Sequence, residues 1–204
     1  MCLNILALQR QSHVAEGVAS LSVSARITEV LEYIKHTSSE IDFVSLPEGD
    51  QLLSGACSWV DCIVLSKHSS LEAIEITEKL KRRGAQVIYD IDDWIFSFPS
   101  YSGGKSQSEK IAQIQYLIEL ADCVTVANAN LYERLRGKYQ NISLVPNGMW
   151  VEKYNAMPCF SCSEREDRRP KIVFTNADFI KMQTAKTYCL LHYKCSLLKT
   201  LTLS

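Results

Sequence analysis

The sequence predicts an α/β fold with a Rossmann-like, doubly wound parallel sheet. Six short apolar runs, rich in β-branched residues, recur between residues 4 and 146, and such runs are typical of parallel strands covered on both faces. Segments with the spacing of amphipathic helices lie between these runs, so strand and helix alternate along the chain. This alternation indicates repeated βαβ units with right-handed crossovers.

The predicted strands are short and continuously apolar. They are "NILAL" from Asn4, "IDFVSL" from Ile41, "CIVLS" from Cys62, "QVIYDI" from Gln86, "CVTVA" from Cys123 and "ISLVP" from Ile142. Because runs of this kind favour strands that are buried on both faces, we expect the sheet to lie at the centre of the domain.

The first two predicted helices are defined by apolar spacing and by their ends. One carries the stripe Ile27, Val30, Leu31 and Ile34, and Ser24 is its expected N-cap. The other spans 71–83 and turns Leu71, Ile74, Thr77 and Leu80 to one side. It is expected to end at Gly84, since glycine readily adopts the left-handed conformation that closes a helix.

Two later helices are predicted from their first turns. Ser106-x-x-Glu109 and Asn130-x-x-Glu133 both resemble a capping box, in which side chains at the helix start satisfy free backbone N–H groups. The helix that follows Ser106 is expected to turn five apolar side chains inward: Ile111, Ile114, Leu117, Ile118 and Ala121.

The pattern of alternating elements predicts one complete domain, residues 1–154. Residues 155–170 lack periodicity and contain the charged run "EREDRRP", so we interpret them as an interdomain linker. Residues 171–204 begin with the strand-like run "KIVFTN" and continue without another strand-turn-helix cycle. We interpret this last segment as the truncated start of a second α/β domain with an irregular tail.

Length and composition limit the classes of protein to consider. The 204 residues, 47% of them hydrophobic, accommodate one domain of ordinary size and part of another. The net charge of −1 provides no basic field, so nucleic-acid binding is not expected. No secretory leader is recognisable and no apolar run approaches the ~20 residues of a membrane span. We therefore expect a cytoplasmic protein without a transmembrane span, and peripheral membrane contact stays open.

Eight cysteines raise the question of disulfides or a metal site. Several fall inside strand-like or helix-like runs without a secretory signal, so reduced thiols are expected. One group has the ligand types of a zinc site: Cys159, Cys162, Cys189, His192 and Cys195. Because the spacing between its halves is loose, we expect incidental cysteines and no metal, with zinc as the alternative.

The stretch "VIYDIDDWIF", residues 87–96, places three carboxylates directly after a predicted strand. In doubly wound sheets ligands bind beyond the carboxyl ends of the strands, so Asp90, Asp92 and Asp93 are candidate functional residues. Asp90 taken alone is better explained as a residue that shapes a turn. Trp94 and Phe96 are expected to pack inward. No G-x-G-x-x-G follows the first strand, so NAD binding is not expected.

Four stretches together resemble a known enzyme family. They are "VIYDIDDWIF", "ELADCVTVANANLYERL", "NISLVPNGMWVEKY" and "PKIVFTNADFIK". They look like the amino-terminal half of a GT-B glycosyltransferase of the retaining family-4, or "glycosyl transferases group 1", type, and the resemblance covers roughly residues 4–181. It implies two Rossmann-like domains, the first binding a saccharide or lipid-linked acceptor and the second binding a nucleotide-sugar donor as co-substrate, with no other cofactor.

The resemblance also implies roles for individual residues. Asp92 and Asp93 hold the place of the catalytic side chain that points into the cleft after the fourth strand. Asp90, Asn128, Asn147 and Gly148 would lie on the acceptor side, and Asn176 and Lys181 on the donor side. No metal site is implied. Because the second domain ends soon after its first strand, we expect this chain alone to show little or no transfer.

Three alternatives stay open at the level of sequence. A haloacid-dehalogenase-like phosphatase would use Asp90 as the nucleophile and Asp92 as the acid–base group, since they have that spacing. A non-catalytic sugar- or partner-binding α/β domain would need neither. The Asp-x-Asp pattern could also bind a divalent cation through its oxygen ligands.

Overall fold

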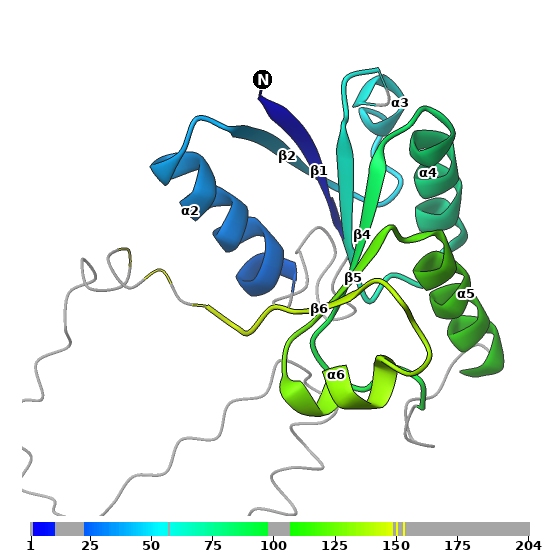
Figure 1. The fold of residues 1–204 in the computed structure, drawn as a ribbon. Helices are drawn as coiled ribbons and strands as arrows, with labels where there is room; N and C mark the ends of the chain where they lie inside the picture. The colour runs from blue at the N-terminus through cyan, green and yellow to red at the C-terminus, as the bar shows by residue number, and fades with distance from the viewer. Residues whose placement is uncertain are drawn as a thin grey trace, which may run out of the picture. The chain divides into compact units, whose positions relative to one another are not determined.

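The computed structural model describes residues 2–10, 23–56, 58–97, 107–148, 150 and 153, and these all belong to one compact unit, Met1–Met157. The expected linker, 155–170, and the expected start of a second domain, 171–204, lie outside the described residues. Figure 1 shows the described elements as a sheet with helices on both of its faces.

The sheet has six strands in the order β2-β1-β3-β4-β5-β6, and every neighbouring pair is parallel. The strands are β1 (Leu3–Gln9), β2 (Ile41–Pro47), β3 (Cys62–Ser66), β4 (Gln86–Ile91), β5 (Cys123–Val126) and β6 (Ile142–Leu144). Each of the six predicted runs forms one of them. The predicted α/β fold with a doubly wound parallel sheet is therefore confirmed.

The helices cover the two faces unequally. The π-helical turn η1 (Ser24–Thr28) and α2 (Glu29–Thr37) pack on one face, and the second core cluster there includes Ile5, Ala7, Ile27, Leu31 and Cys62. The larger core cluster lies on the other face, under α3 (Leu53–Ala56), α4 (Leu71–Arg82), α5 (Gln107–Leu120) and α6 (Ala129–Leu135). Figure 1 shows α2 on the opposite side of the sheet from α4 and α5.

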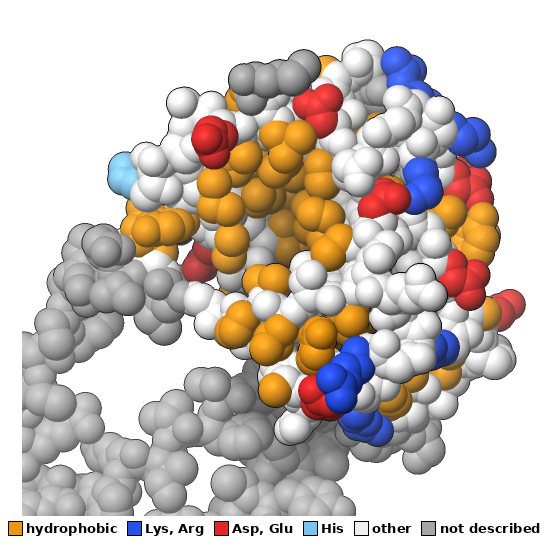
Figure 2. Space-filling model, viewed as in Figure 1, with side chains coloured by type: hydrophobic (Ala, Val, Ile, Leu, Met, Phe, Trp, Pro, Cys, Tyr) orange, Lys and Arg blue, Asp and Glu red, His pale blue; other side chains and the backbone are white. Residues whose placement is uncertain are grey.

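Successive side chains of the central strands point alternately to the two faces of the sheet. In β3, Ile63 and Leu65 belong to the larger cluster, whereas Cys62 and Val64 face η1 and α2. Val64 is half-buried, as is Ile88 of β4 on the same face. Figure 2 shows hydrophobic side chains lining a hollow on this side of the molecule, between α2 and the strands next to it.

Several predicted helix ends are corrected by the structure. Ser24 does not cap a helix, because it lies within the π-helical turn and no side-chain cap precedes it. The N-cap of α6 is Asn128 rather than Asn130, since the Asn128 Oδ1 accepts a hydrogen bond from the Leu131 N–H. In α4 the helix ends as expected, with Gly84 in the left-handed conformation at φ 93°.

The predicted inward-facing stripes are largely observed. Val30 of α2 and Leu71 of α4 are exceptions, because they are 38% and 63% exposed. Leu71 stands at the first position of its helix, and Ala73 and Ile76 are buried instead. The fully buried Ile114, Leu117 and Ile118 of α5 confirm that stripe.

The order of the strands locates the ligand crevice expected for such a sheet. From β1 the chain moves to β2 on one side, then crosses to β3 on the other side of β1 and continues outward to β6. The strand order therefore reverses between β1 and β3, and open α/β sheets bind ligands beyond the carboxyl ends of the strands at such a switch point. No helix among the described residues is both long and apolar enough to cross a membrane.

The two glycines Gly84 and Gly148 provide a matched test of backbone strain. A Cβ added at either position meets no atom within 4 Å, but Gly84 has a left-handed φ of 93° and Gly148 does not. We expect Gly84→Ala to lower the free energy of unfolding by about 1 kcal/mol or more, because alanine is strained at positive φ. Gly148→Ala should leave it unchanged in urea denaturation. Equal effects would contradict the backbone conformations described here.

Candidate functional site

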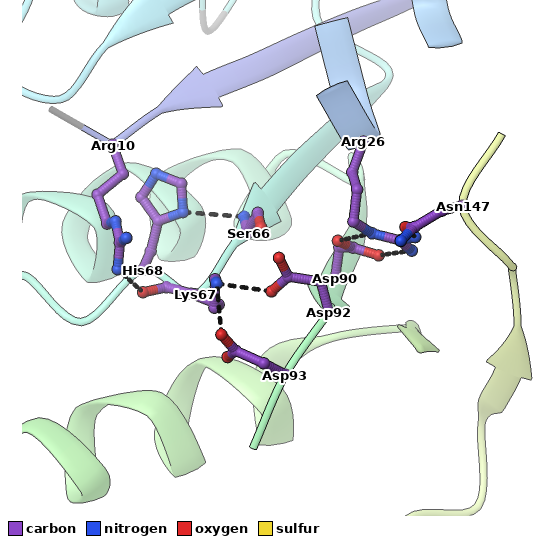
Figure 3. Close-up of polar contacts among 9 residues, drawn as sticks. All are labelled: Arg10, Arg26, Ser66, Lys67, His68, Asp90, Asp92, Asp93 and Asn147. Atoms are coloured by element: carbon purple, nitrogen blue, oxygen red, sulfur yellow. Dashed lines mark hydrogen bonds and ion pairs between the residues drawn. The ribbon is translucent and has the colours of Figure 1, made fainter. Parts of the chain in front are cut away.

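Residues that follow four neighbouring strands meet at the carboxyl edge of the sheet. Arg10 follows β1, Glu48 follows β2, Lys67 and His68 follow β3, and Asp92 and Asp93 follow β4. Because the strands are parallel, their ends deliver all of these residues to one edge, on both sides of the switch point. Figure 3 shows most of this group, and its charged side chains come from elements far apart in the sequence.

The side chain of Lys67 holds the two predicted catalytic acids. Its Nζ lies 2.7 Å from Asp92 Oδ1 and 3.2 Å from Asp93 Oδ2 (Figure 3). The Lys67 side chain is 11% exposed and that of Asp92 is 19% exposed, whereas that of Asp93 is 66% exposed. Asp92 is therefore a mostly enclosed partner of the ammonium, and Asp93 is the carboxylate that a ligand can reach.

The backbone of Lys67 is in an unusual conformation. Its φ of 53° makes it the one non-glycine residue with positive φ in the part of the chain that the structure describes. Such a conformation costs free energy for any residue with a Cβ, and residues held this way are frequent at ligand sites. Here it redirects the chain directly after β3, so that Lys67 points toward Asp92 while His68 turns into the protein.

His68 is completely buried and electrically neutral. Its Nδ1 accepts a hydrogen bond of 3.0 Å from the Ser66 N–H, so in the neutral ring the proton is on Nε2. The Tyr89 hydroxyl donates to the His68 carbonyl at 2.8 Å and fixes the same turn. Burial, with a smaller contribution from the positive charge of Arg10, lowers the pKa of His68 to about 3.

Glu48 and Arg10 lie next to this histidine. Glu48 Oε1 is 3.2 Å from His68 Nε2, although neither atom forms a hydrogen bond. Burial raises the pKa of Glu48, and the Ser70 hydroxyl opposes that shift. The Arg10 Nη1 donates a long hydrogen bond of 3.3 Å to the Lys67 carbonyl, which connects the end of β1 to the turn after β3.

Buried side-chain atoms without a hydrogen bond gather at this edge. Among the described residues they are Arg10 Nε, Glu48 Oε1, Ser66 Oγ, His68 Nε2 and Asp92 Oδ1, and the remaining one is Tyr139 Oη in the loop before β6. Asp92 has Lys67 as a charge partner. We call the other four residues of the edge, Arg10, Glu48, Ser66 and His68, the switch-point group. Unsatisfied buried polar atoms are rare in folded proteins, and internal water commonly provides the partner at such places.

A second network next to the site is built on Arg26. Its Nε and Nη2 donate to the two oxygens of Asp90 at 2.8 and 2.6 Å, and Thr125 Oγ1 donates to Asp90 Oδ1 at 2.7 Å. The side chains of Arg26 and Asp90 are 7% and 5% exposed. This buried, bidentate ion pair joins η1 to β4 and β5, and the hydrogen bonds from Arg26 to Asp90 raise the pKa of the guanidinium.

Arg26 also holds the turn that follows β6. Its Nη1 donates to Asn147 Oδ1 at 2.5 Å and its Nη2 donates to the Val145 carbonyl at 3.1 Å (Figure 3). Neither Asn147 nor Gly148 has a positive φ. Arginine contacts, rather than turn conformation, fix this part of the chain.

The structure separates the residues that the sequence grouped together. Asp92 and Asp93 lie at the carboxyl edge, as expected for the site. Asp90 is bound by Arg26, and Asn128 is a helix cap. Gly148 is exposed, and a Cβ added there would meet no neighbouring atom within 4 Å. The expected donor-side residues, Asn176 and Lys181, lie outside the described residues.

Asp90 lacks the access that a nucleophile needs. It is 3% exposed, and both of its oxygens accept hydrogen bonds from Arg26. A carboxylate that attacks phosphorus must reach its substrate, so this arrangement disfavours the phosphatase alternative. The described residues also contain no cluster of His, Cys, Asp and Glu side chains able to hold a metal ion. The five residues of the possible zinc site lie outside the described part of the chain.

The inward packing of the two aromatic residues after the acids is confirmed. Trp94 and Phe96 are partly buried against the larger core cluster and contact each other edge to face, with ring centroids 5.1 Å apart. The Arg134 guanidinium of α6 lies 3.8 Å from the centroid of the Trp94 ring. These contacts anchor the segment just beyond Asp93.

Six residues at or beside the site were not predicted as site residues: Arg10, Arg26, Glu48, Ser66, Lys67 and His68. Four of them immediately follow strands that the sequence did predict. Applying the strand-end rule to every strand, rather than to the "DIDD" stretch alone, would have identified those four. Arg26 gives no such signal, because it lies inside a helical segment.

We expect the Arg26–Asp90 pair to be essential for stability. Arg26→Met should lower the free energy of unfolding by on the order of 3 kcal/mol, because it leaves the Asp90 carboxylate buried without its cation. Asp90→Asn should also destabilise, and the double variant should cost less than the sum of the two. Chemical denaturation measures all three.

The exposed pair Lys35–Asp42 is the control for this prediction, since its side chains are 51% and 59% exposed. Lys35→Met should leave the unfolding transition unchanged, as is usual for surface ion pairs. A variant Arg26→Met as stable as the wild type would contradict the structural role of the buried pair.

The low pKa of His68 predicts a dependence of stability on pH. The unfolded state takes up a proton near pH 6.5 and the folded state takes it up only near pH 3, so stability is lost as the pH falls from about 6.5. We expect His68 to contribute a loss of roughly 1 kcal/mol per pH unit in this interval. Denaturation at pH 7.0, 6.0 and 5.0 should show a shallower dependence in His68→Asn than in the wild type.

The exposed His36 provides the matched control. His36→Asn should keep the dependence of the wild type. The raised pKa of Glu48 has the opposite effect, because it adds stability as the pH falls. Glu48 is present in the wild type and in both histidine variants, so it does not account for a difference between them. Ring resonances of His68 that titrate near pH 6.5 in NMR spectra would contradict its buried, neutral state.

Comparison with known proteins adds no assignment to this geometry. No protein-family model matches the chain, and no curated protein sequence matches it. The fold and the arrangement of side chains at the carboxyl edge therefore provide the physical basis for a functional proposal.

Proposed function

We propose that residues 1–154 form the acceptor-side domain of a GT-B glycosyltransferase, which transfers a sugar from a nucleotide-sugar to a saccharide or lipid-linked acceptor. The observation that carries the proposal is the position of Asp92 and Asp93 beyond the end of β4, where Lys67 binds both. Open α/β sheets bind ligands at this edge. The resemblance of the four sequence stretches supports the same family.

Asp93 is the residue that we assign to contact the acceptor. Its side chain is 66% exposed, so it can accept a hydrogen bond from a hydroxyl group of a bound saccharide. Asp92 is more enclosed and lies nearer to Lys67. We assign Asp92 the task of positioning the ammonium, which in turn fixes the direction of Asp93.

Lys67 has a second use in this proposal. An ammonium group has three hydrogens; Asp93 accepts one of them in a hydrogen bond, and Asp92 forms an ion pair with the same group. A remaining hydrogen can donate to a ligand oxygen next to the hydroxyl that Asp93 accepts. A carboxylate and an ammonium side by side can therefore bind two neighbouring hydroxyl groups, which suits a sugar ring.

Saturation-transfer NMR with a panel of methyl glycosides, oligosaccharides and nucleotide-sugars tests the proposal. We expect saccharides to bind, and we expect Asp93→Asn and Lys67→Met to weaken their binding at least fivefold, because each variant removes a direct contact. Arg83→Gln, a charge change on an exposed residue where α4 leads into β4 at the opposite edge, is the control and should bind like the wild type. A folded protein that binds no saccharide would contradict the proposal.

Catalysis is tested separately from binding. Transfer of a radiolabelled sugar from a nucleotide-sugar to a bound saccharide, lost in Asp93→Asn, would establish the transferase. Because this chain alone is expected to show little or no transfer, saccharide binding without transfer agrees with the proposal, and turnover by these 204 residues would contradict that expectation. Micromolar binding of a nucleotide-sugar that is unaffected by Asp93→Asn would show that the donor has a site elsewhere in the chain.

A further inference from the structure

The turn after β3 is held by three hydrogen bonds from different parts of the chain. Arg10 Nη1, just after β1, donates to the Lys67 carbonyl at 3.3 Å. The Tyr89 hydroxyl, on β4, donates to the His68 carbonyl at 2.8 Å. Within the turn, the Ser66 N–H donates to His68 Nδ1 at 3.0 Å. The backbone is therefore fixed both before and after Lys67.

These contacts hold Lys67 in a conformation that costs free energy. Its φ is 53°, and a residue with a Cβ persists at such a value only where the surrounding structure enforces it. Tyr89 is suited to this task, because its side chain is completely buried in the larger core cluster. Close packing leaves the ring little freedom, so its hydroxyl is a fixed donor for the turn.

The conformation of the turn determines where the Lys67 ammonium lies. Nζ donates a hydrogen bond of 3.2 Å to Asp93 Oδ2 and lies 2.7 Å from Asp92 Oδ1. A lysine side chain that is free in solvent loses rotamer freedom when a ligand orders it, and this loss weakens binding. The Lys67 side chain is only 11% exposed and is already ordered in the folded protein, so a ligand need not order it.

We propose that Tyr89 is a positioning residue of the candidate site: its hydroxyl fixes the left-handed turn at Lys67 and thereby places the ammonium beside Asp92 and Asp93. Arg10, a member of the switch-point group, supports the same turn through the Lys67 carbonyl. Tyr89 does not contact the ligand, because its side chain has no exposed surface. The inference rests on the proposed function and deepens it, since Tyr89 affects saccharide affinity through Lys67.

NMR of isotopically labelled ammonium groups tests the placement of Lys67 without any ligand. At low temperature and mildly acidic pH, an ammonium held by carboxylates exchanges its hydrogens with water slowly enough to give a signal, and Lys67→Met identifies the signal of Lys67. We expect Tyr89→Phe, which removes only the hydroxyl, to broaden or remove this signal. Lys81, held by Asp122 and the Leu120 carbonyl, is the internal control and should keep its signal.

Calorimetric titration with the best-binding saccharide tests whether this placement serves the site. We expect Tyr89→Phe to weaken binding by about threefold, less than Lys67→Met, because the ammonium is present but must be ordered by the ligand. The matched control is Thr77→Val, which removes another fully buried hydroxyl, one that donates to the Ala73 carbonyl at 2.6 Å within α4. It should bind like the wild type and keep the Lys67 signal. If Tyr89 had a structural role alone, its variant would behave like this control.

Glycine substitution tests the strain at Lys67. Lys67→Gly and Lys67→Ala both lose the ammonium, and glycine adopts a left-handed φ without strain. We therefore expect Lys67→Gly to unfold at a higher urea concentration than Lys67→Ala. At the exposed Lys79 within α4 the order should be reversed, since glycine destabilises a helix interior. Equal stability of the two Lys67 variants would contradict the strained turn on which the inference depends.

The outcomes distinguish this inference from the function on which it rests. An unchanged Lys67 signal or an unchanged saccharide affinity in Tyr89→Phe would overturn the inference alone, as would a wild type without a Lys67 signal. If no saccharide binds, the proposed function fails, and the ammonium signal decides the inference by itself. Circular dichroism establishes that each variant is folded. Arg10→Met, which removes the donor to the Lys67 carbonyl, replaces Tyr89→Phe in both measurements if that variant does not fold.

Discussion

The parallel direction of all six strands is the constraint on which the site depends. Residues that follow different strands are separated by tens of positions in the sequence, yet parallel pairing brings them to one edge. Lys67 and Asp93 meet in this way across 26 positions, and the end of β1 reaches the turn after β3 through Arg10. An antiparallel sheet would send alternate strand ends to opposite edges and would dismantle the cluster.

Two ion-pair systems at this edge perform different tasks, and burial distinguishes them. Arg26 and Asp90 are enclosed and have further partners in Thr125 and Asn147, so their contacts connect structural elements. The pair formed by Lys67 and Asp93 is open on one side. A charged group that keeps part of its surface in solvent can exchange its partner for a ligand, whereas a buried bidentate pair cannot do so without a large loss of stability.

Most of the fold could be predicted from the sequence, because hydrophobic periodicity and helix ends are local signals. All six strand runs and the end of α4 at Gly84 are of this kind. The predicted cap of α6 was wrong by two residues, since Asn128 and Asn130 are equally good caps by residue type and the helix begins after Asn128.

The site was only partly predictable, for a different reason. Asp92 and Asp93 stand out as adjacent charges after an apolar run, but single residues such as Lys67 and His68 carry no comparable signal. Their importance comes from a left-handed backbone after β3 and from complete burial of the imidazole, and neither property is written in the local sequence. Likewise, nothing in the local sequence indicates that Asp90 forms a buried ion pair with Arg26.

Mapping of ligand contacts by amide chemical shifts tests the central claim most directly. In a titration of the isotopically labelled chain with the best-binding saccharide, the account predicts that the largest changes occur at the four strand ends that carry Arg10, Glu48, Lys67 and Asp93. Changes confined to the opposite edge, such as the turn at 83–86 between α4 and β4, would contradict it, as would a spectrum that no saccharide alters.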